Sequence, residues 1–234
     1  MGAIDPGIPR DLVVRLSESL GITALVETGT YQGDSALWAS GVFPEVVTIE
    51  ASPELHANAL CRLLPAKNVT LLLGDSRELL RRLVPTLTRP TMFWLDAHWS
   101  DGRTVGKGDE CPLLGELHAV LGSPVDHLVL IDDARYFLAP PPDPHNGEQW
   151  PTILQICEVF KNRGFQVYVF RDVIFGASLG AAERVTEVLK EAATRELLER
   201  SRPSRDAKTT VSDRPRDFCG RLRAAAKVLL NLTP

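Results

Sequence analysis

The stretch Ala24-Leu25-Val26-Glu27-Thr28-Gly29-Thr30-Tyr31-Gln32-Gly33 runs from an apolar segment directly into a turn that contains two glycines. The apolar residues are continuous rather than alternating, which is typical of a strand buried on both faces of a parallel sheet. Gly29 and Gly33 allow the backbone to turn tightly and to approach a ligand. The stretch therefore predicts a central parallel strand that ends in a ligand-facing loop.

Further strand-length apolar runs follow along the chain and alternate with helical patterns. The predicted strands are 46–50, 69–73, 91–96, 127–132, 166–170 and 173–175. The predicted helices are about 9–20, 34–40, 53–64, 76–83, 112–121 and 151–163. Alternation of this kind predicts βαβ units in a doubly wound α/β sheet.

The last two predicted strands break this alternation. Only Arg171 and Asp172 separate 166–170 from 173–175. A parallel crossover needs a dozen or more residues, so these two strands must form an antiparallel hairpin. The prediction is a Rossmann-like, mostly parallel seven-stranded sheet with a terminal antiparallel strand.

Charge divides the chain of 234 residues, whose net charge is −4. Residues 1–180 carry 14 Lys and Arg against 22 Asp and Glu, whereas residues 181–234 carry 12 against 8. Residues 216–232 have an amphipathic helical pattern, and the preceding 201–217 read as a linker. We therefore expect one domain over 1–180 and a helical, basic extension over 181–234.

Several function classes are disfavoured. The acidic balance disfavours a nucleic-acid partner. No apolar run approaches the roughly 18 residues of a membrane span, and no signal peptide is evident, so we expect a cytoplasmic protein that does not bind membranes. The four cysteines lack CxxC spacing, which disfavours a thiolate zinc site, and no Gly-x-Ser-x-Gly hydrolase motif occurs.

Acidic residues end the first three predicted strands. Glu27 belongs to the opening stretch, Glu50 ends 46–50, and Asp75 with Ser76 follows 69–73. Glu50 can accept both hydroxyls of a ribose, and Asp75 can accept an adenine amine. The alternatives are a solvated acid at 50 and a helix cap at Asp75 or Ser76. Because the Gly-x-Gly-x-x-Gly spacing of dinucleotide sites is absent, a nucleoside without a phosphate chain fits better.

Together these features resemble the class I S-adenosylmethionine-dependent methyltransferases over about residues 20–178. The motifs that carry the resemblance are Glu27-Thr-Gly29-Thr-Tyr-Gln-Gly33, Thr48-Ile-Glu50 and Gly74-Asp75-Ser76. The resemblance implies that S-adenosylmethionine is the cofactor. It implies that Gly29 and Gly33 pass its methionine part, Glu27 lies near its amino group, Glu50 holds the ribose and Asp75 the adenine. The predicted cofactor-binding residues are Glu27, Gly29, Gly33, Ser35, Glu50, Asp75, Ser76 and Asp96.

Two later strand ends carry Asp96-Ala97-His98 and Asp132-Asp133. Carboxylates gathered at adjacent strand ends repel one another unless a cation such as Mg²⁺ neutralises them. Helix capping, or pairing with Arg135 or Arg103, is the alternative. The arrangement resembles the metal-dependent O-methyltransferases of the catechol and sugar or macrolide types, which implies that Asp96, Asp132 and Asp133 bind Mg²⁺.

Methyl transfer to a hydroxyl also needs a proton acceptor, and histidine suits that task at neutral pH. His98 and His145 are both candidates, and the sequence does not choose between them. Trp99, Tyr136 and Trp150 favour a carbohydrate acceptor, because Trp150 could offer a flat face to a sugar ring. We expect an enzyme that methylates a hydroxyl of a sugar or another small natural product, as a homodimer. The alternative is a non-catalytic methyltransferase-like module that binds a nucleoside or a partner.

Overall fold

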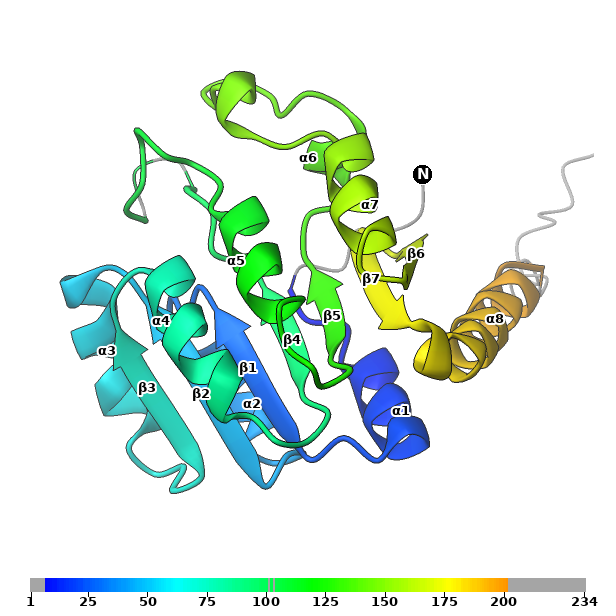
Figure 1. Ribbon diagram of the computed structural model, residues 1–234. Helices are drawn as coiled ribbons and strands as arrows, with labels where there is room; N and C mark the ends of the chain where they lie inside the picture. Colours follow the sequence, from blue (N-terminus) through cyan, green and yellow to red (C-terminus); the bar gives the residue numbers. More distant parts are fainter. Residues whose placement is uncertain (1–6, 101, 103, 202–234) are drawn as a thin grey trace, which may run out of the picture. The chain divides into compact units, whose positions relative to one another are not determined.

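A computed structural model describes residues 7–100, 102 and 104–201 of the chain (Figure 1). Its strands form one sheet in the order β3-β2-β1-β4-β5-β7-β6. The strands are β1 (Ala24–Thr28), β2 (Glu45–Glu50), β3 (Val69–Leu73), β4 (Met92–Leu95), β5 (Leu128–Ile131), β6 (Phe165–Phe170) and β7 (Val173–Ser178). β7 pairs antiparallel with β5 and with β6, whereas the pairs among β1 to β5 are parallel. The predicted seven-stranded, mostly parallel sheet is confirmed.

Helices alternate with the strands as predicted. They are α1 (Arg10–Leu20), α2 (Asp34–Ala39), α3 (Pro53–Leu63), α4 (Ser76–Leu83), α5 (Leu113–Val120), α6 (Arg135–Leu138), α7 (Ile153–Lys161) and α8 (Leu179–Ser201). The sequence patterns did not predict three short elements, namely the 3₁₀ turns η1 (Val84–Thr86) and η2 (Gly147–Gln149) and the helix α6. Such short elements bury too few residues to produce a periodic apolar signal.

Capping residues explain where several helices begin. The Ser52 hydroxyl accepts from the Leu55 backbone N–H, and Pro53 takes the first helical position of α3. Thr152 and Gln155 form a reciprocal capping box at the start of α7. These local signals agree with the apolar faces that the two helices bury.

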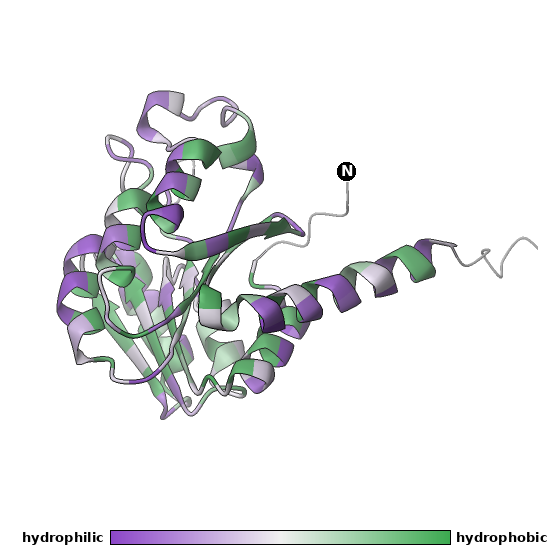
Figure 2. Ribbon diagram, turned by 45° about the vertical axis from the view of Figure 1, so that its right-hand side comes forward, coloured by the Kyte–Doolittle hydropathy of each residue, from purple (hydrophilic) through white to green (hydrophobic). Residues whose placement is uncertain are grey.

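The sheet is covered on both faces, which explains its continuous apolar strands. Leu25 and Trp94 lie in one core cluster with residues of α1, α2, α3 and α8, whereas Val26 and Phe93 lie in a second cluster with residues of α4, α5, α6 and α7. Successive residues of a strand point to opposite faces, so both must be apolar. Figure 2 shows this distribution as apolar strands between helices of mixed polarity.

The described residues divide into two units, one ending at Arg195 and the other beginning at Glu196, and the site described below lies in the first. The assignment of 181–234 to an extension stays a prediction, and the helix expected over 216–232 lies outside the described residues. Within the described part of the chain, no helix has the length and apolarity needed to cross a membrane.

Candidate active site

A cavity of about 360 Å³ lies where β1, β2, β3 and β4 end. Ligands of open α/β sheets bind at this carboxyl edge, and the volume suits a small molecule. The chain between β4 and α5 forms the other part of the wall. The predicted cofactor-binding, metal-binding and catalytic residues that line the cavity are Gly29, Glu50, Asp75, Ser76, Asp96 and His98, and Trp99 lines it as well. Glu27, Gly33, Ser35, Asp132, Asp133 and His145 are described but do not line it.

Glu50 presents a buried carboxylate to this cavity from the end of β2. Its Oε2 accepts from the Tyr31 backbone N–H and its Oε1 accepts from the Ser52 backbone N–H, both at 2.8 Å. A carboxylate oxygen can accept more than one hydrogen bond. Glu50 therefore keeps acceptor capacity for a pair of ligand hydroxyls.

Glu27 lies beneath this wall in a hydroxyl network. The Thr48 hydroxyl donates to Glu27 Oε2 at 2.6 Å, and the Thr30 and Thr48 hydroxyls are also 2.6 Å apart. Burial raises the pKa of Glu27 to about 8, although hydrogen bonds from Thr48 and Ser35 oppose the shift. At pH 7 the carboxyl group of Glu27 is therefore mostly protonated and neutral. Its hydrogen bond with Thr48, and the contact of Thr48 with Thr30, connect the turn after β1 to β2.

Gly29 brings the same turn against β4. Its φ is +85°, and a Cβ placed there would lie 2.4 Å from the Asp96 carbonyl oxygen. Only glycine permits this approach. Gly33 has φ +79° and immediately precedes α2. Both glycines shape the turn, and only Gly29 reaches the cavity wall.

The Asp75 carboxylate is engaged by its own helix. Asp75 Oδ1 accepts from the Arg77 backbone N–H, and the Arg77 guanidinium donates to both carboxylate oxygens, at 3.1 and 2.6 Å. Arg77 also pairs with Asp109 at 2.6 Å, which connects α4 to the chain between β4 and α5. The helix-cap alternative therefore describes Asp75, and binding of adenine by its carboxylate would have to compete with Arg77.

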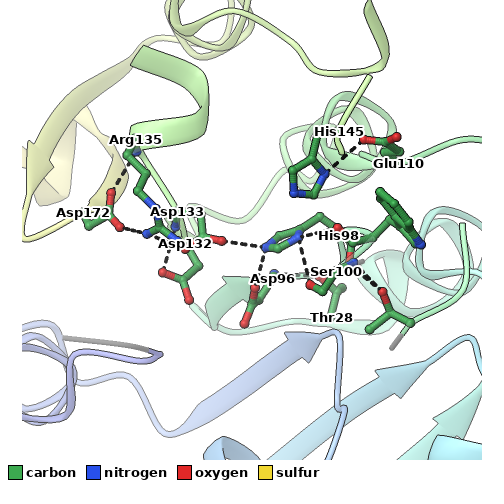
Figure 3. Close-up of polar contacts among 12 residues, drawn as sticks. Thr28, Asp96, His98, Ser100, Glu110, Asp132, Asp133, Arg135, His145 and Asp172 are labelled. Atoms are coloured by element: carbon green, nitrogen blue, oxygen red, sulfur yellow. Dashed lines mark hydrogen bonds and ion pairs between the residues drawn. The ribbon is translucent and has the colours of Figure 1, made fainter. Parts of the chain in front are cut away.

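His98 lies between two of the predicted metal-binding acids (Figure 3). Its Nε2 is 2.9 Å from Asp133 Oδ2 and 3.3 Å from Asp96 Oδ1. Burial lowers the pKa of His98, but the two carboxylates outweigh burial, so its pKa lies well above the usual value. The His98 charge thus offsets the repulsion expected between the acids.

Arg135 supplies a second positive charge to this group. Its NH1 is 2.8 Å from Asp133 Oδ1, and the same nitrogen pairs with Asp172 in the turn between β6 and β7. Asp132 accepts from the Asp133 backbone N–H at 2.8 Å, while burial and the charges of Asp96 and Asp133 raise its pKa to about 8. These acids are therefore neutralised by protein cations and by protonation.

This arrangement does not fit a divalent metal centre. Across residues 7–100, 102 and 104–201, no three His, Cys, Asp or Glu side chains are grouped as a metal site. The alternative of pairing with Arg135 is what the structure shows for Asp133, while Arg103 lies outside the described residues. A metal at Asp96, Asp132 and Asp133 would require His98 and Arg135 to move.

His145 is held by Glu110, a residue that the sequence patterns did not single out. Glu110 accepts from the Trp150 Nε1–H at 2.8 Å and from the Asn146 backbone N–H at 3.1 Å, and His145 Nδ1 lies 3.2 Å from its Oε2. These contacts of Glu110 connect the segments 101–111 and 139–149. The sequence indicates these segments only as two separate long loops. Of the two histidines, only His98 lines the cavity.

The expectation that Trp150 offers a flat face to a sugar ring is wrong. Its side chain is only 6% exposed, and its ring packs against His98, Phe137 and His145. Its indole N–H is the donor to Glu110. The ring belongs to a buried core cluster that includes Phe137 and Ile156, which its position in the sequence alone could not reveal.

Glu116 is a second acid that the sequence patterns did not mark. It projects from α5, is 1% exposed, and its Oε1 has no hydrogen-bond partner within the part of the chain that the structure describes. Burial raises its pKa to about 7, against hydrogen bonds from the Ser76 and Thr28 hydroxyls. A glutamate within a helical pattern reads as a solvated residue, so nothing in the sequence distinguished it.

The comparisons with known proteins agree on the fold. No family model and no curated protein matches this chain. An O-methyltransferase from Bacillus cereus in complex with SAH is 16% identical, with a TM-score of 0.52, and the match covers 76% of this chain and 84% of that one. A Staphylococcus aureus protein provisionally assigned as a caffeoyl-CoA O-methyltransferase is 15% identical, with a TM-score of 0.54, covering 75% and 85%.

An SAH-bound methyltransferase from Podospora anserina is also similar, at 20% identity and a TM-score of 0.51, covering 70% of this chain and 75% of that one. These identities are too low to carry an activity or a substrate across. The sheet order, the terminal hairpin and these neighbours together show that the chain has the fold of the class I S-adenosylmethionine-dependent methyltransferases.

Proposed function

We propose that the protein is an S-adenosylmethionine-dependent O-methyltransferase that acts on a hydroxyl of a sugar or another small natural product. The observation that carries this proposal is one continuous cavity. The Glu50 carboxylate and the Gly29 turn lie on its wall together with His98 and Asp96. A nucleoside part and a reacting hydroxyl could therefore be held side by side.

The residues on the wall divide between two tasks. Glu50 would accept from the ribose hydroxyls, while the backbone at Gly29 allows the methionine part to pass close to β4. When bound, the cofactor supplies an activated methyl group, so transfer depends mainly on positioning. His98 is the candidate histidine on the wall. Because Asp133 and Asp96 hold its pKa well above the usual value, it would have to pass its own proton to one of these carboxylates before it could take the proton of the acceptor hydroxyl.

Support for a carbohydrate acceptor comes from the polar part of the cavity. Ser100 and Thr104 lie on its wall beside His98, and the Ser100 backbone N–H donates to the Thr104 hydroxyl at 2.7 Å. Hydroxyl and carboxylate groups can exchange hydrogen bonds with a polyhydroxyl ligand. Buried Trp150 lends no support to this part of the proposal.

Dependence on Mg²⁺ is a separate matter, and no step here uses a metal. Asp96, Asp132 and Asp133 would have to leave their present partners to bind an ion. Methyl transfer measured after exhaustive chelation tests the point. Activity lost on chelation and restored by Mg²⁺ alone would establish a metal role, whereas unchanged activity would remove it.

The proposal is tested first by calorimetry with SAH. The wild-type protein should bind SAH, and Glu50→Ala should weaken binding about 100-fold or more, because two hydrogen bonds to a charged group are lost. Glu50→Gln keeps the size of the side chain but removes the charge, and it should also weaken binding. The matched control is Glu54→Ala, an exposed residue in the first turn of α3, which should bind like the wild type.

The second measurement is transfer of a labelled methyl group to methyl glycosides and to catechol. Transfer to a glycoside hydroxyl supports the sugar proposal. Absence of SAH binding at millimolar concentration would refute the enzyme proposal altogether. Tight SAH binding without transfer to any hydroxyl compound would instead favour a non-catalytic nucleoside-binding module.

A further inference from the structure

An ion pair lies at the entrance of the cavity, beside Asp75. Arg77 NH1 is 2.6 Å from Asp109 Oδ2, which connects α4 to the chain before α5. Both side chains line the cavity, and both are also open to solvent, with 31% of the Arg77 side chain and 57% of the Asp109 side chain exposed. Because side chains that face both a cavity and the solvent lie at its entrance, this pair closes part of that entrance.

Arg77 is the fixed partner of this pair. Its Nε and NH2 donate to the Asp75 carboxylate at 3.1 and 2.6 Å. Its aliphatic part lies against α5, where Gly115 leaves room for it, because a Cβ at Gly115 would lie 2.8 Å from Arg77 Cδ. Figure 1 shows α4 beside α5. These contacts do not involve Asp109, so the guanidinium can keep its position when Asp109 moves away.

Asp109 is the partner that can move. It ends a turn in which its backbone N–H donates to the Gly106 carbonyl at 2.8 Å, and Gly106 has φ +111°. The next residue, Glu110, is buried and accepts from the Trp150 Nε1–H at 2.8 Å. The Asp109 side chain is instead held by a solvent-exposed ion pair, which contributes little to stability and is screened by salt. The pair can therefore open while Glu110 stays in place.

We propose that Arg77 and Asp109 form a latch that must open before the cofactor can enter the cavity and before SAH can leave it. This inference rests on the proposed function, since it takes the ligand of the cavity to be the cofactor. A latch of this kind controls how fast a ligand passes the entrance, not how tightly the cavity holds it. Loss of the latch should therefore change the association and dissociation rate constants by the same factor.

The experiment is stopped-flow tryptophan fluorescence with SAH as the probe, because Trp99 lies on the cavity wall and can report binding. Asp109→Asn keeps the size of the side chain and removes its charge. Both SAH rate constants should become about three- to fivefold larger, as expected when an exposed ion pair is lost. The dissociation constant measured by calorimetry should change by less than about twofold, because the open and closed entrances lead to the same bound state.

Salt and a second variant separate a latch from a merely structural role of Asp109. Raising NaCl from about 0.05 to about 0.5 M screens exposed charges, so the wild-type protein should release SAH faster by a similar factor. Asp109→Asn should release SAH at nearly the same rate at both salt concentrations. In the background of Arg77→Gln, Asp109→Asn should produce no further acceleration, because the ion pair is already absent.

The control is Lys107→Gln, an exposed charged residue of the same turn that does not line the cavity, which should keep the wild-type rates. Unchanged SAH rates in Asp109→Asn, or the same salt dependence as in the wild type, would overturn this inference alone. Weaker SAH binding with an unchanged association rate would also overturn it, because Asp109 would then hold the ligand. If the wild-type protein binds no SAH at millimolar concentration, the proposed function fails, and this inference fails with it.

Discussion

The carboxyl group of Glu27 is buried, and its pKa of about 8 makes folding stability depend on pH. The folded state holds the proton more tightly than the unfolded chain, whose Glu pKa is near 4.5. The contribution is therefore fully present below about pH 4.5 and is lost as the pH rises through 8.

Glu27→Gln should remove this dependence, because the amide stays neutral at every pH. Between pH 5 and pH 8.5 the wild type should lose a few kcal/mol of unfolding free energy relative to Glu27→Gln, at about 1.4 kcal/mol per pKa unit. Urea unfolding at both pH values measures the difference. Parallel pH profiles for the two proteins would contradict a neutral Glu27.

Gly29 should tolerate alanine far less than a glycine that is free of neighbours. Gly29→Ala places a Cβ against the Asp96 carbonyl oxygen, whereas a Cβ at Gly164, which has φ +73°, would meet no atom within 4 Å. Gly164→Ala should cost only the left-handed backbone penalty of about 1–2 kcal/mol. Gly29→Ala should cost clearly more in urea unfolding, and equal costs would show that the turn can move away from β4.

The sequence predicted which residues at strand ends reach the cavity, but it did not predict the acids whose contacts come from distant segments of the chain. The positions of Glu50 and His98 follow from β2 and β4, because a strand end determines where the next side chain lies. Glu110 and Glu116 acquire their surroundings from segments distant in sequence, through Trp150 and Ser76. No local pattern encodes such contacts, so composition and spacing could not reveal them.

At the scale of elements, the β6–β7 hairpin formed despite an unfavourable turn sequence. Arg171 and Asp172 both have positive φ, at 52° and 67°, where Asn-Gly is preferred. Tertiary contacts offset this cost: Arg171 pairs with Asp11 at 2.6 Å, and Asp172 accepts from the Arg135 backbone N–H at 2.8 Å. Because only two residues connect β6 and β7, the sequence predicted an antiparallel hairpin. The contacts that stabilise its turn were visible only in the structure.

Gly176 in β7 makes room for α7. A Cβ at this position would lie 2.1 Å from Phe160 Cε1, and Phe160 is fully buried. Gly176→Ala should therefore destabilise the protein by about 1–3 kcal/mol, as overpacking does. In the background of Phe160→Leu the same substitution should cost less, because the ring that it meets is gone.

Denaturant unfolding of the four proteins in this double-mutant cycle measures the coupling. Additive costs would show that Gly176 matters for the strand backbone rather than for packing against α7. Leu154, exposed on the same helix, provides the control through Leu154→Ala, which should show no coupling to Gly176→Ala.

At the scale of the whole molecule, a ligand that binds only the folded state must raise its melting temperature. SAH at 100 times its dissociation constant should stabilise the protein by about 2.7 kcal/mol, which is about 5–10 °C for a domain of this size. Thermal unfolding followed by circular dichroism measures the shift. At the same SAH concentration, Glu50→Ala should keep a shift of only about 1–2 °C or less, because binding about 100-fold weaker leaves about 0.4 kcal/mol of stabilisation. An equal shift would place SAH elsewhere.

The position of β7 has a consequence for synthesis of the chain. β5 pairs with β7 and not with β6, although β6 is made first. The outer edge of β5 therefore stays unpaired in the nascent chain until Ile174, which pairs with Ile131, has left the ribosome. An open apolar strand edge invites association with other chains. A chain whose translation stalls after β5 but before β7 should therefore be prone to aggregation, even though its five parallel strands are complete.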